Sequence, residues 1–426
     1  MNSASLPTLL ATSFEFPAAK SKQGNQATAG LACRIETAFQ GLDEQREAWD
    51  NAVIRLGGSI YMSYDWTRLW WQFYGANHLL RVFVFTVEHE IVGILPIYID
   101  CMRVWPFRFR VARLVGASIP PKVFNPPVHP QWANSIFEQI LHQLFQEDAC
   151  DLLSFGPVSE LYAPTNSLIK VCQEKTTLVC GATLASHSVH TVWYLPKTVD
   201  EFYQSLSRNE RKNRKADLKK LQNEHGVKID VLSAHPPVGA EFENFLHQHA
   251  AQWSSEGKPG HFGAWPCARE FNRALVAAHG KLGRVRFTRL QAEAGTIASI
   301  YGFAFGTSYY CELPARSTDP QWNRFSLGPA GIVATISAAI GERMTRLEGG
   351  LAHYDYKLRL NAKEHATKII RAVASPIKSR LLAAFFAALR CCLLFSYHKV
   401  WYQRVTPHLP RRFSRLQGRF WLRLDF

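Results

Sequence analysis

The stretch that decides the fold is FSLGPAGIVATISAAIGERMTRLEGGLAHYDYKLRLNAKEH, residues 325–365. It opens with a turn that contains two glycines, Gly328 and Gly331. Apolar residues at helical spacing follow over residues 332–344 and predict a helix, which the glycine pair at 349–350 ends. A glycine turn that leads into a helix N-terminus presents backbone N–H groups to an anion. The stretch therefore predicts a phosphate site, although such glycines are as typical of a plain structural turn.

The end of this stretch is dense in side chains that can carry or bind a proton. His353, Tyr354, Asp355, Tyr356 and Lys357 follow one another directly. His353 and Asp355 are two residues apart, so on a strand they would share a face. A phosphate-binding turn followed by such a cluster is what a transferase acting on a phosphate-bearing cofactor needs.

Length, composition and charge favour a globular protein of two domains with a basic tail. The chain has 426 residues, of which 47% are hydrophobic and 19% charged. It is therefore long for one core and too apolar for a disordered chain. Of the net charge of +15, residues 376–426 carry +9, from ten Lys or Arg against one Asp, which leaves +6 for residues 1–375. The charge thus says little about the substrate of the core.

Cysteine usage and the chain ends indicate the compartment. Nine cysteines are scattered without a CxxC pair, which is typical of a reducing environment, and no Cys or His spacing predicts a metal site. Residues 1–30 form an expected flexible leader, without the pattern of a secretion signal. We find no run of about 20 apolar residues and expect no spanning helix. We expect a cytoplasmic protein, with peripheral attachment to the inner face of the membrane left open.

The pattern of elements predicts an α/β protein with a mixed sheet. We divide it into a first unit over residues 31–195, a second over residues 196–375 and a tail over residues 376–426. Each unit contains a β-hairpin of similar layout, at residues 81–98 and 284–305, which favours an internal duplication. Helices are expected near residues 43–56, 63–74, 131–146, 198–225, 238–253, 268–279 and 332–344.

Two motifs carry a resemblance to a known family. Gly328-Pro329 precedes a helix, and Glu348 is followed by Gly350 and then by Tyr356-Lys357. This pattern resembles a bacterial branch of the GNAT acetyltransferase superfamily, of the cellulose- or exopolysaccharide-biosynthesis type, which is similar to Fem-type aminoacyltransferases. The resemblance covers residues 198–365 in detail and residues 31–195 only in layout. Ala352 departs from it, since a second glycine is expected there.

The resemblance implies two tandem GNAT-like domains and an acyltransferase. It would move an acyl group, acetyl in the first instance, from acyl-CoA to an amine or hydroxyl in exopolysaccharide or envelope glycan synthesis. Family members hold the pyrophosphate of acyl-CoA between splayed strands and the N-terminus of the next helix. The residues that take this place here are Leu327, Gly328, Ala330 and Gly331, supplemented by Arg324.

Acyl transfer needs a base for the acceptor and an acid for the leaving thiolate. Asp355 and Glu312 are the favoured catalytic carboxylates, and Tyr356 is the favoured proton donor. His353, His261 and Tyr310 are the other candidates. Each of these residues is also compatible with a purely structural role.

Further residues predict substrate contacts. Lys357 is a charge partner or a phosphate contact. In the basic run over residues 208–220, Arg211 and Arg214 either bind an anionic substrate or the phosphates of the cofactor, or belong to a solvated face. Nucleic acid is the least favoured partner, because no aromatic platform accompanies the run. Trp253 and His261 are candidates for an acceptor pocket, in which Trp253 offers a stacking face for a sugar, although a core position suits Trp253 equally.

Three functions remain open at this stage. The first is acyl transfer from acetyl-CoA to a small-molecule or glycan acceptor. The second is a Fem-like transfer from aminoacyl-tRNA, which would use the basic run. The third is a non-catalytic interaction protein of a glycan-synthesis complex. The interleaved arginines and aromatics of the tail suit an anionic membrane surface, or a helical pair packed on the second unit.

Overall fold

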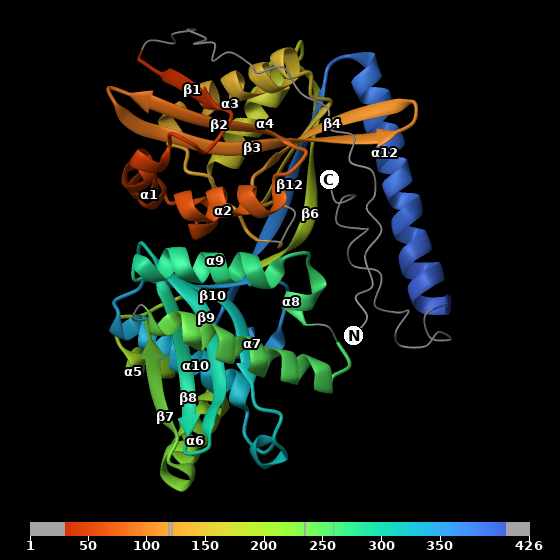
Figure 1. Cartoon of the computed structure of the whole chain (residues 1–426). Coiled ribbons are helices and arrows are strands. Elements are labelled where there is room, and N and C mark those ends of the chain that lie inside the picture. Colours follow the sequence, from red (N-terminus) through yellow and green to blue (C-terminus); the bar gives the residue numbers. More distant parts are fainter. Residues whose placement is uncertain (1–29, 118–119, 121, 234–235, 259, 406–426) are drawn as a thin grey trace, which may run out of the picture.

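The computed structural model describes residues 30–117, 120, 122–233, 236–258 and 260–405. The leader, up to residue 29, and the end of the tail, from residue 406, lie outside these residues. The strands form one continuous twelve-stranded sheet that runs through both units (Figure 1). The strand order is β1-β2-β3-β4-β5-β12-β6-β11-β10-β9-β8-β7.

The first unit contributes six strands and four α-helices, joined by short helical turns. The elements of this unit are β1 (Ala32–Glu36), η1 (Asp43–Gln45), α1 (Arg46–Arg55), η2 (Ile60–Met62), α2 (Tyr64–Tyr74), β2 (Leu79–Val87), β3 (Glu90–Val104), β4 (Phe107–Leu114), η3 (Pro130–Trp132), α3 (Ala133–His142), η4 (Gln143–Glu147), β5 (Leu152–Ser159), α4 (Pro164–Glu174) and β6 (Val179–Tyr194). The predicted helix over residues 131–146 is divided into η3, α3 and η4, and α4 was not predicted.

The second unit begins with two additional helices. The expected helix over residues 198–225 is divided at Ser207, because α5 ends before this residue and its hydroxyl caps α6 by accepting from the Glu210 N–H at 3.3 Å. The elements are α5 (Val199–Ser205), α6 (Arg208–His225), β7 (Lys228–Leu232), α7 (Pro237–Ser255), α8 (His261–Ala264), α9 (Ala268–Lys281), β8 (Val285–Ala292), β9 (Gly295–Phe305), β10 (Ser308–Arg316), η5 (Pro320–Trp322), α10 (Leu327–Gly341), β11 (Arg346–Leu351), α11 (Asp355–Arg359) and β12 (Lys363–Ala374).

The two units repeat one order of elements. Each has a strand, two main helices, three antiparallel strands, a helix, a strand parallel to the one before that helix, a further helix and a last strand. In the first unit these run from β1 to β6, and in the second from β7 to β12. The predicted duplication therefore extends over the whole of both units, and the α/β class with a mixed sheet is confirmed.

The last strands of the two units are exchanged. β12 of the second unit pairs with β5 of the first, in a register that places Thr367 opposite Ser159. β6 of the first unit pairs with β11 of the second, with Glu348 opposite Val192. β6 and β12 also pair with each other along most of their length. The boundary at residue 195 falls after β6, but neither unit has a complete sheet by itself.

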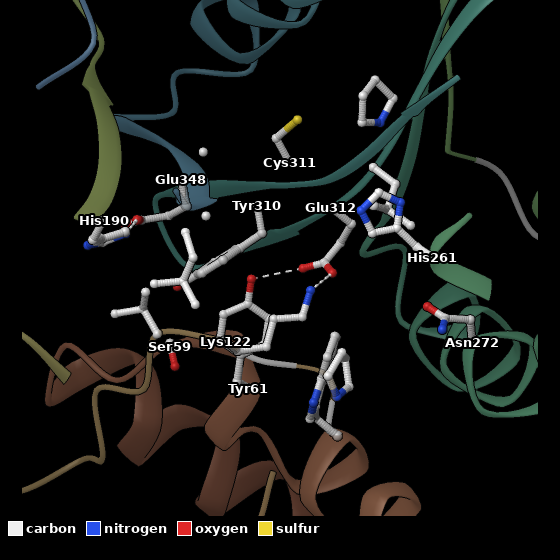
Figure 2. Close-up of a pocket in the computed structure, with 18 of the residues that line it drawn as sticks. Ser59, Tyr61, Lys122, His190, His261, Asn272, Tyr310, Cys311, Glu312 and Glu348 are labelled. Carbon is white, nitrogen blue, oxygen red and sulfur yellow. Dashed lines mark hydrogen bonds and ion pairs between the residues drawn. The ribbon is translucent and has the colours of Figure 1, made fainter. Parts of the chain in front are cut away.

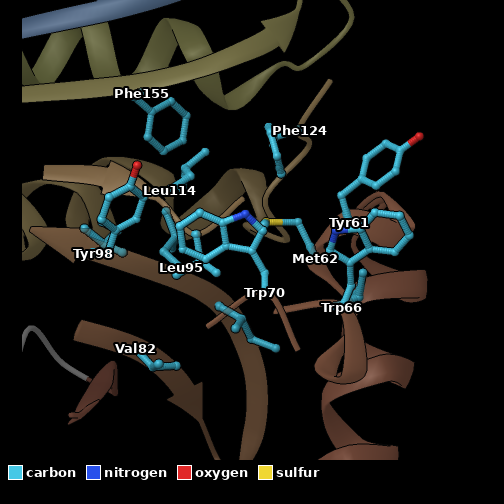
Figure 3. Packing of buried hydrophobic residues seen from close by; sticks show 14 of the residues in the cluster. Tyr61, Met62, Trp66, Trp70, Val82, Leu95, Tyr98, Leu114, Phe124 and Phe155 are labelled. Carbon is cyan, nitrogen blue, oxygen red and sulfur yellow. The ribbon is translucent and has the colours of Figure 1, made fainter. Parts of the chain in front are cut away.

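One aromatic core joins the two units. The aromatic face of α2 is buried, and Figure 3 shows Trp66 and Trp70 in this packing. The Trp66 ring lies 5.6 Å from that of Phe303 and 6.1 Å from that of Phe271, both in the second unit. Such edge-to-face contacts add to the free energy of burying aromatic area. The units are therefore held by packing as well as by the sheet.

The tail begins with α12 (Ile377–Phe395), followed by η6 (Ser396–Val405). The Phe386 ring stacks on Phe109 of β4 at 4.7 Å, and the Ser379 hydroxyl donates to Asp151 at 2.6 Å. α12 therefore packs on the first unit, not on the second. Within the described part of the chain, one helix, Ile377–Trp401, is long and apolar enough to cross a membrane by length and composition. The expectation that no helix could span a membrane is therefore corrected, by length and composition alone.

The strand exchange predicts that neither unit folds alone. Residues 30–195 and residues 196–405, expressed separately, should aggregate because each exposes unpaired strand edges, and their co-expression should yield a soluble complex. If a protease site is inserted between Leu195 and Val199 of the full chain, the cleaved halves should elute together in size-exclusion chromatography. A separate first unit that unfolds cooperatively on its own would contradict the exchange.

His279 of α9 predicts a loss of stability in acid. Its ring is buried 5.3 Å from that of Phe303, and burial lowers its pKa to about 3. The unfolded chain binds this proton below the ordinary pKa of 6.5, whereas the folded chain does not. The free energy of unfolding should therefore fall from pH 6.5 to pH 5, by about 1.4 kcal/mol per pH unit from this residue.

Urea unfolding at several pH values checks this dependence. His279→Leu should reduce the pH dependence of the unfolding free energy, since Leu cannot bind the proton in either state. The control, His247→Leu, removes an exposed histidine of α7 and should leave the dependence as it is. Equal pH dependence in the native chain and His279→Leu would show that His279 does not titrate as described.

Candidate active site

The site lies where two neighbouring strands of the second unit separate. β10 and β11 are paired, in parallel, only over three residues each, ending at Tyr310 and Glu348. Beyond these residues β10 continues beside β9, and β11 continues beside β6. A cavity of about 450 Å³ lies at this opening and is lined by both units.

A β-bulge directs Glu312 into this cavity. The register of β10 against β9 shifts between Cys311 and Leu313, so Glu312 is the extra residue of the bulge. Bulges re-aim side chains in this way. The Glu312 side chain is only 4% exposed, yet it lines the cavity. The predicted catalytic carboxylate is therefore buried at the point where the strands separate.

Two side chains of the first unit hold Glu312. The Tyr61 hydroxyl donates to Glu312 Oε1 at 2.8 Å, and the Lys122 ammonium forms an ion pair with Oε2 (Figure 2). Lys122 also lies over the Tyr61 ring, at 5.3 Å from its centre. A buried carboxylate requires such partners. The site is thus built from both units.

Burial keeps the neighbouring phenols and the thiol protonated. It raises the pKa of Tyr61 well above its ordinary value, and the negative charge of Glu312 adds to the effect. The pKa of Tyr310 is raised mainly by burial, and that of Cys311 rises to about 12 for the same reason. At neutral pH Tyr61 is therefore a hydrogen-bond donor, and Cys311 is not a thiolate nucleophile.

A glutamate–histidine pair lies at the opening between the strands. Glu348, the last residue of β11 that pairs with β10, is 2.6 Å from His190 Nε2. His190 comes from β6, the strand that the first unit contributes to the second. Its Nδ1 atom is buried and has no hydrogen-bond partner among the described residues.

The far end of the cavity is aromatic. His261 and Trp253 both line it, with their ring centres 5.1 Å apart. His261 Nδ1 is 3.2 Å from His249 Nε2. Burial lowers the pKa of both histidines, that of His249 to about 4, so both are neutral at pH 7. The Lys258 ammonium lies 5.2 Å from the Trp253 ring, so it covers part of the predicted stacking face.

Lys357 and Tyr356 of α11 line another part of the cavity. The Lys357 ammonium is buried, donates to the Gly349 carbonyl at 2.8 Å and lies 4.7 Å from the centre of the Tyr354 ring. Burial lowers its pKa. These contacts tie Lys357 to the turn after β11. Tyr356 lines this cavity and also a second, smaller one.

The second cavity, of about 300 Å³, lies at the N-terminus of α10. It is lined by Ser326 and Pro329, by Arg214 of α6 and by α11. The Arg214 side chain is 10% exposed, and its Nε and Nη1 atoms lie 3.2 and 3.1 Å from the carboxylates of Glu210 and Asp217. Neither atom makes a hydrogen bond within the described structure. A buried cation beside a helix N-terminus is an arrangement suited to an anion.

The residues predicted to hold the cofactor differ in whether they are free to contact a ligand. The N–H of Gly328 has no hydrogen-bond partner in the part of the chain described, whereas that of Ala330 bonds to the Ser326 carbonyl. The side chains of Leu327 and Ala330 are in the core, and Gly331 packs against Ile300. Only Gly328 therefore leaves a free donor. Arg324 contacts His225 at 2.8 Å, and neither Arg324 nor Arg211 lines either cavity.

Asp355 lies apart from the cavity. Its side chain is 85% exposed and accepts from His353 Nε2 at 3.1 Å. β11 ends at Leu351, and Asp355 starts the short helix α11. The expectation that His353 and Asp355 share a strand face is wrong for this reason. The prediction that Asp355 acts as a base gains no support from this position.

Three residues of the site were not predicted, namely Tyr61, Lys122 and His190. All three belong to the first unit and meet Glu312 or Glu348 only through the fold. One signal was present for Lys122, which is the sole Asp, Glu, Lys or Arg between Arg113 and Glu138. An isolated charge in an apolar, proline-rich segment needs a partner when it is buried. No group of side chains that could hold a metal ion occurs among the described residues.

Comparison with known proteins agrees with this geometry. Residues 208–358 match the family model described as "Acetyltransferase (GNAT) domain". No curated protein matches the chain. The crystal structure of FemX is 9% identical, with a TM-score of 0.57, over 80% of this chain and 98% of that chain.

Two further solved structures are similar over most of their length. A conserved protein of unknown function from Bacteroides thetaiotaomicron VPI-5482 is 9% identical, with a TM-score of 0.47, over 80% of this chain and 99% of that one. A tandem GNAT protein from the clavulanic acid biosynthesis pathway is 11% identical, with a TM-score of 0.41, over 81% and 99%. Residues 208–358 thus match a GNAT acetyltransferase domain, and the likeness to FemX shows a shared fold over most of the chain.

The buried ion pair at Glu312 predicts a large cost for breaking it. Lys122→Met should lower the free energy of unfolding by about 3 kcal/mol, because Glu312 is left buried with one partner. Adding Glu312→Gln should recover part of this loss, which a double-mutant cycle in urea measures. Lys258→Met, at an exposed pair with Glu256, should cost about 0.5 kcal/mol. Additive effects of the first two substitutions would contradict the pairing.

Proposed function

We propose that the protein is an acyltransferase that moves an acyl group, acetyl in the first instance, from acyl-CoA to an amine or hydroxyl. One observation carries this proposal. Tyr356 lines two cavities, one with a buried arginine at a helix N-terminus and one with a buried carboxylate at the opening between β10 and β11. Acyl transfer from a long, phosphate-bearing donor needs these two environments at the two ends of one path.

The smaller cavity suits the phosphates of the donor. The free N–H of Gly328 and the N-terminal end of α10 favour an anion, and Arg214 supplies a cation beside them. From there the pantetheine arm would pass Tyr356, which lines both cavities. Beyond Tyr310 and Glu348 the facing backbone groups of the two strands no longer pair with each other. The amides of the arm can form hydrogen bonds with them.

The larger cavity supplies the groups for the chemical step. Glu312 would take a proton from the acceptor as its nitrogen or oxygen attacks the thioester carbonyl and forms the new bond. Tyr356 would give a proton to the sulfur as the carbon–sulfur bond breaks. Burial raises the pKa of Tyr356, so it holds this proton at neutral pH. Tyr61 and Lys122 position the carboxylate.

The acceptor would enter through the aromatic end of the larger cavity. His261, Trp253 and Trp265 line this end, and apolar rings with a few polar groups suit the faces of a sugar. We therefore propose a glycan or other sugar-like acceptor. Its place in exopolysaccharide or envelope glycan synthesis, in the cytoplasm, rests on the resemblance of residues 348–360 to that branch.

A Fem-like transfer from aminoacyl-tRNA is the second candidate. One side of α6 carries a row of exposed basic residues, namely Arg208, Lys212, Lys215 and Lys219. The same helix lines the smaller cavity through Arg214. A basic row beside the donor site suits the backbone of a nucleic acid, and FemX supports this alternative by its fold alone.

Calorimetry and kinetics with acetyl-CoA test the proposal. Full-length protein should bind acetyl-CoA, and Arg214→Met should weaken binding about tenfold or more, since a charge-assisted contact contributes about 1.5–3 kcal/mol. The control Lys281→Met, at an exposed residue of α9, should leave affinity unchanged. With a hexosamine acceptor, Glu312→Gln should keep donor affinity and lower kcat about 10²–10⁴-fold.

The outcomes separate the candidates. Absence of acetyl-CoA binding at millimolar concentration would refute the acyl-CoA donor. Binding of aminoacyl-tRNA that is lost in the quadruple Gln variant of the α6 row, with no acetyl-CoA binding, would establish the Fem-like alternative. Donor binding with no transfer to any amine or hydroxyl, in the native chain, would favour a non-catalytic interaction protein.

A further inference from the structure

The outward face of α12 is apolar and exposed. One side of the helix packs on β4 through Leu382 and Phe386. The opposite side carries Ile377, which is 72% exposed, and Leu381, which is 66% exposed. The exposed apolar residues recur every three or four positions and so form one stripe along the helix, namely Ile377, Leu381, Ala384, Phe385, Ala388, Cys391, Cys392 and Phe395.

The tip of the β3–β4 hairpin extends this stripe. Trp105 at the tip is 93% exposed, and Phe107 beside it is 46% exposed. The Phe107 ring lies 5.4 Å from that of Phe385 on α12. Figure 1 shows the hairpin reaching across α12. Two segments almost 300 residues apart in the sequence therefore share one apolar surface, which we call the α12–hairpin surface.

Basic residues border this surface, and acidic residues do not occur in either segment. Lys378 and Arg380 are exposed on the two sides of the stripe, and Arg103 and Arg108 are exposed beside the hairpin tip. Residues 101–110 and 376–405 contain no Asp or Glu. An apolar stripe flanked by cations, with a tryptophan at its edge, matches the headgroup region of an anionic bilayer.

We infer that the α12–hairpin surface binds an anionic phospholipid membrane, with α12 lying in the plane of the headgroups. The apolar stripe would enter the bilayer to the depth of the acyl boundary, and Trp105 would anchor the hairpin beside it. The basic residues would contact the phosphates. This inference is independent of the acyl donor and the acceptor.

The packing of α12 favours lying on the membrane over crossing it. Its inner side buries Leu382 and Phe386, and Ser379 bonds to Asp151 of the first unit. A helix that crosses the bilayer would have to give up these contacts. It would also have to place Arg390, near the middle of Ile377–Trp401, within the hydrocarbon, where a charged side chain is costly.

Vesicle co-sedimentation of the full chain tests the inference. The native protein should bind vesicles of phosphatidylcholine and phosphatidylglycerol and bind pure phosphatidylcholine far more weakly. The triple variant Trp105→Gln, Ile377→Gln, Leu381→Gln should lower the affinity for the anionic vesicles about tenfold or more. Lys378→Gln with Arg380→Gln should lower it up to about thirtyfold, at about fivefold per basic residue.

A matched control uses three exposed apolar residues elsewhere. The variant Ile54→Gln, Leu161→Gln, Leu282→Gln removes residues that are 41%, 46% and 39% exposed, and it should bind vesicles as the native chain does. Unchanged thermal unfolding of both triple variants shows that they remain folded. Equal binding by the native chain and the first triple variant would overturn the inference, because residues outside the surface would then bind the lipid.

Two further outcomes would also overturn it. If the native chain dimerises without binding lipid, and the first triple variant is monomeric, the surface joins two copies of this chain. If bound protein resists both high salt and alkaline carbonate, α12 crosses the bilayer. Release by these treatments is the result expected of a helix that lies in the headgroup region.

Discussion

The pairing of β12 with β5, and of β6 with β11, is the constraint on which the rest of the structure depends. Each unit completes its sheet only with a strand of the other, so the backbone hydrogen bonds of the sheet run through the whole chain without an edge at the junction. The aromatic contacts of Trp66 with Phe303 and Phe271 add a shared core. The two units therefore keep a fixed relative position, which a site built from both of them requires.

The proposed active site uses that fixed position. Glu312 is directed by a bulge of β10, but a buried carboxylate is tolerated there because Tyr61 and Lys122 of the first unit reach it. His190 reaches Glu348 because β6 is the exchanged strand. Tyr356 lines both the cavity that holds this charged region and the cavity beside Arg214. The proposed catalytic and phosphate-binding environments are thus positioned by the sheet itself.

Sequence reasoning chose both Glu312 and Asp355 as carboxylates, and their surroundings separate them. Glu312 is buried in the cavity, whereas Asp355 is at the surface. Nothing in the local sequence distinguishes the two, because burial is set by segments distant in the chain. Distant segments also decide which glycine of the turn can bind a ligand. Gly331 packs against Ile300, whereas Gly328 presents a free N–H. The basic residues of α6 are separated in the same way, since Arg214 lines the smaller cavity and Arg211 does not.

The sequence by itself determined most of the elements, the duplication and the class of fold, because hydrophobic period, caps and turn residues act within a few residues of one another. The helices expected near residues 63–74 and 268–279, which the structure has as α2 and α9, are of this kind. Only the tertiary structure decided that the last strands are exchanged, that Lys122 meets Glu312, and that Phe107 lies beside Phe385 of α12. These contacts join residues up to almost 300 positions apart, and their energies depend on burial and geometry that no local pattern encodes.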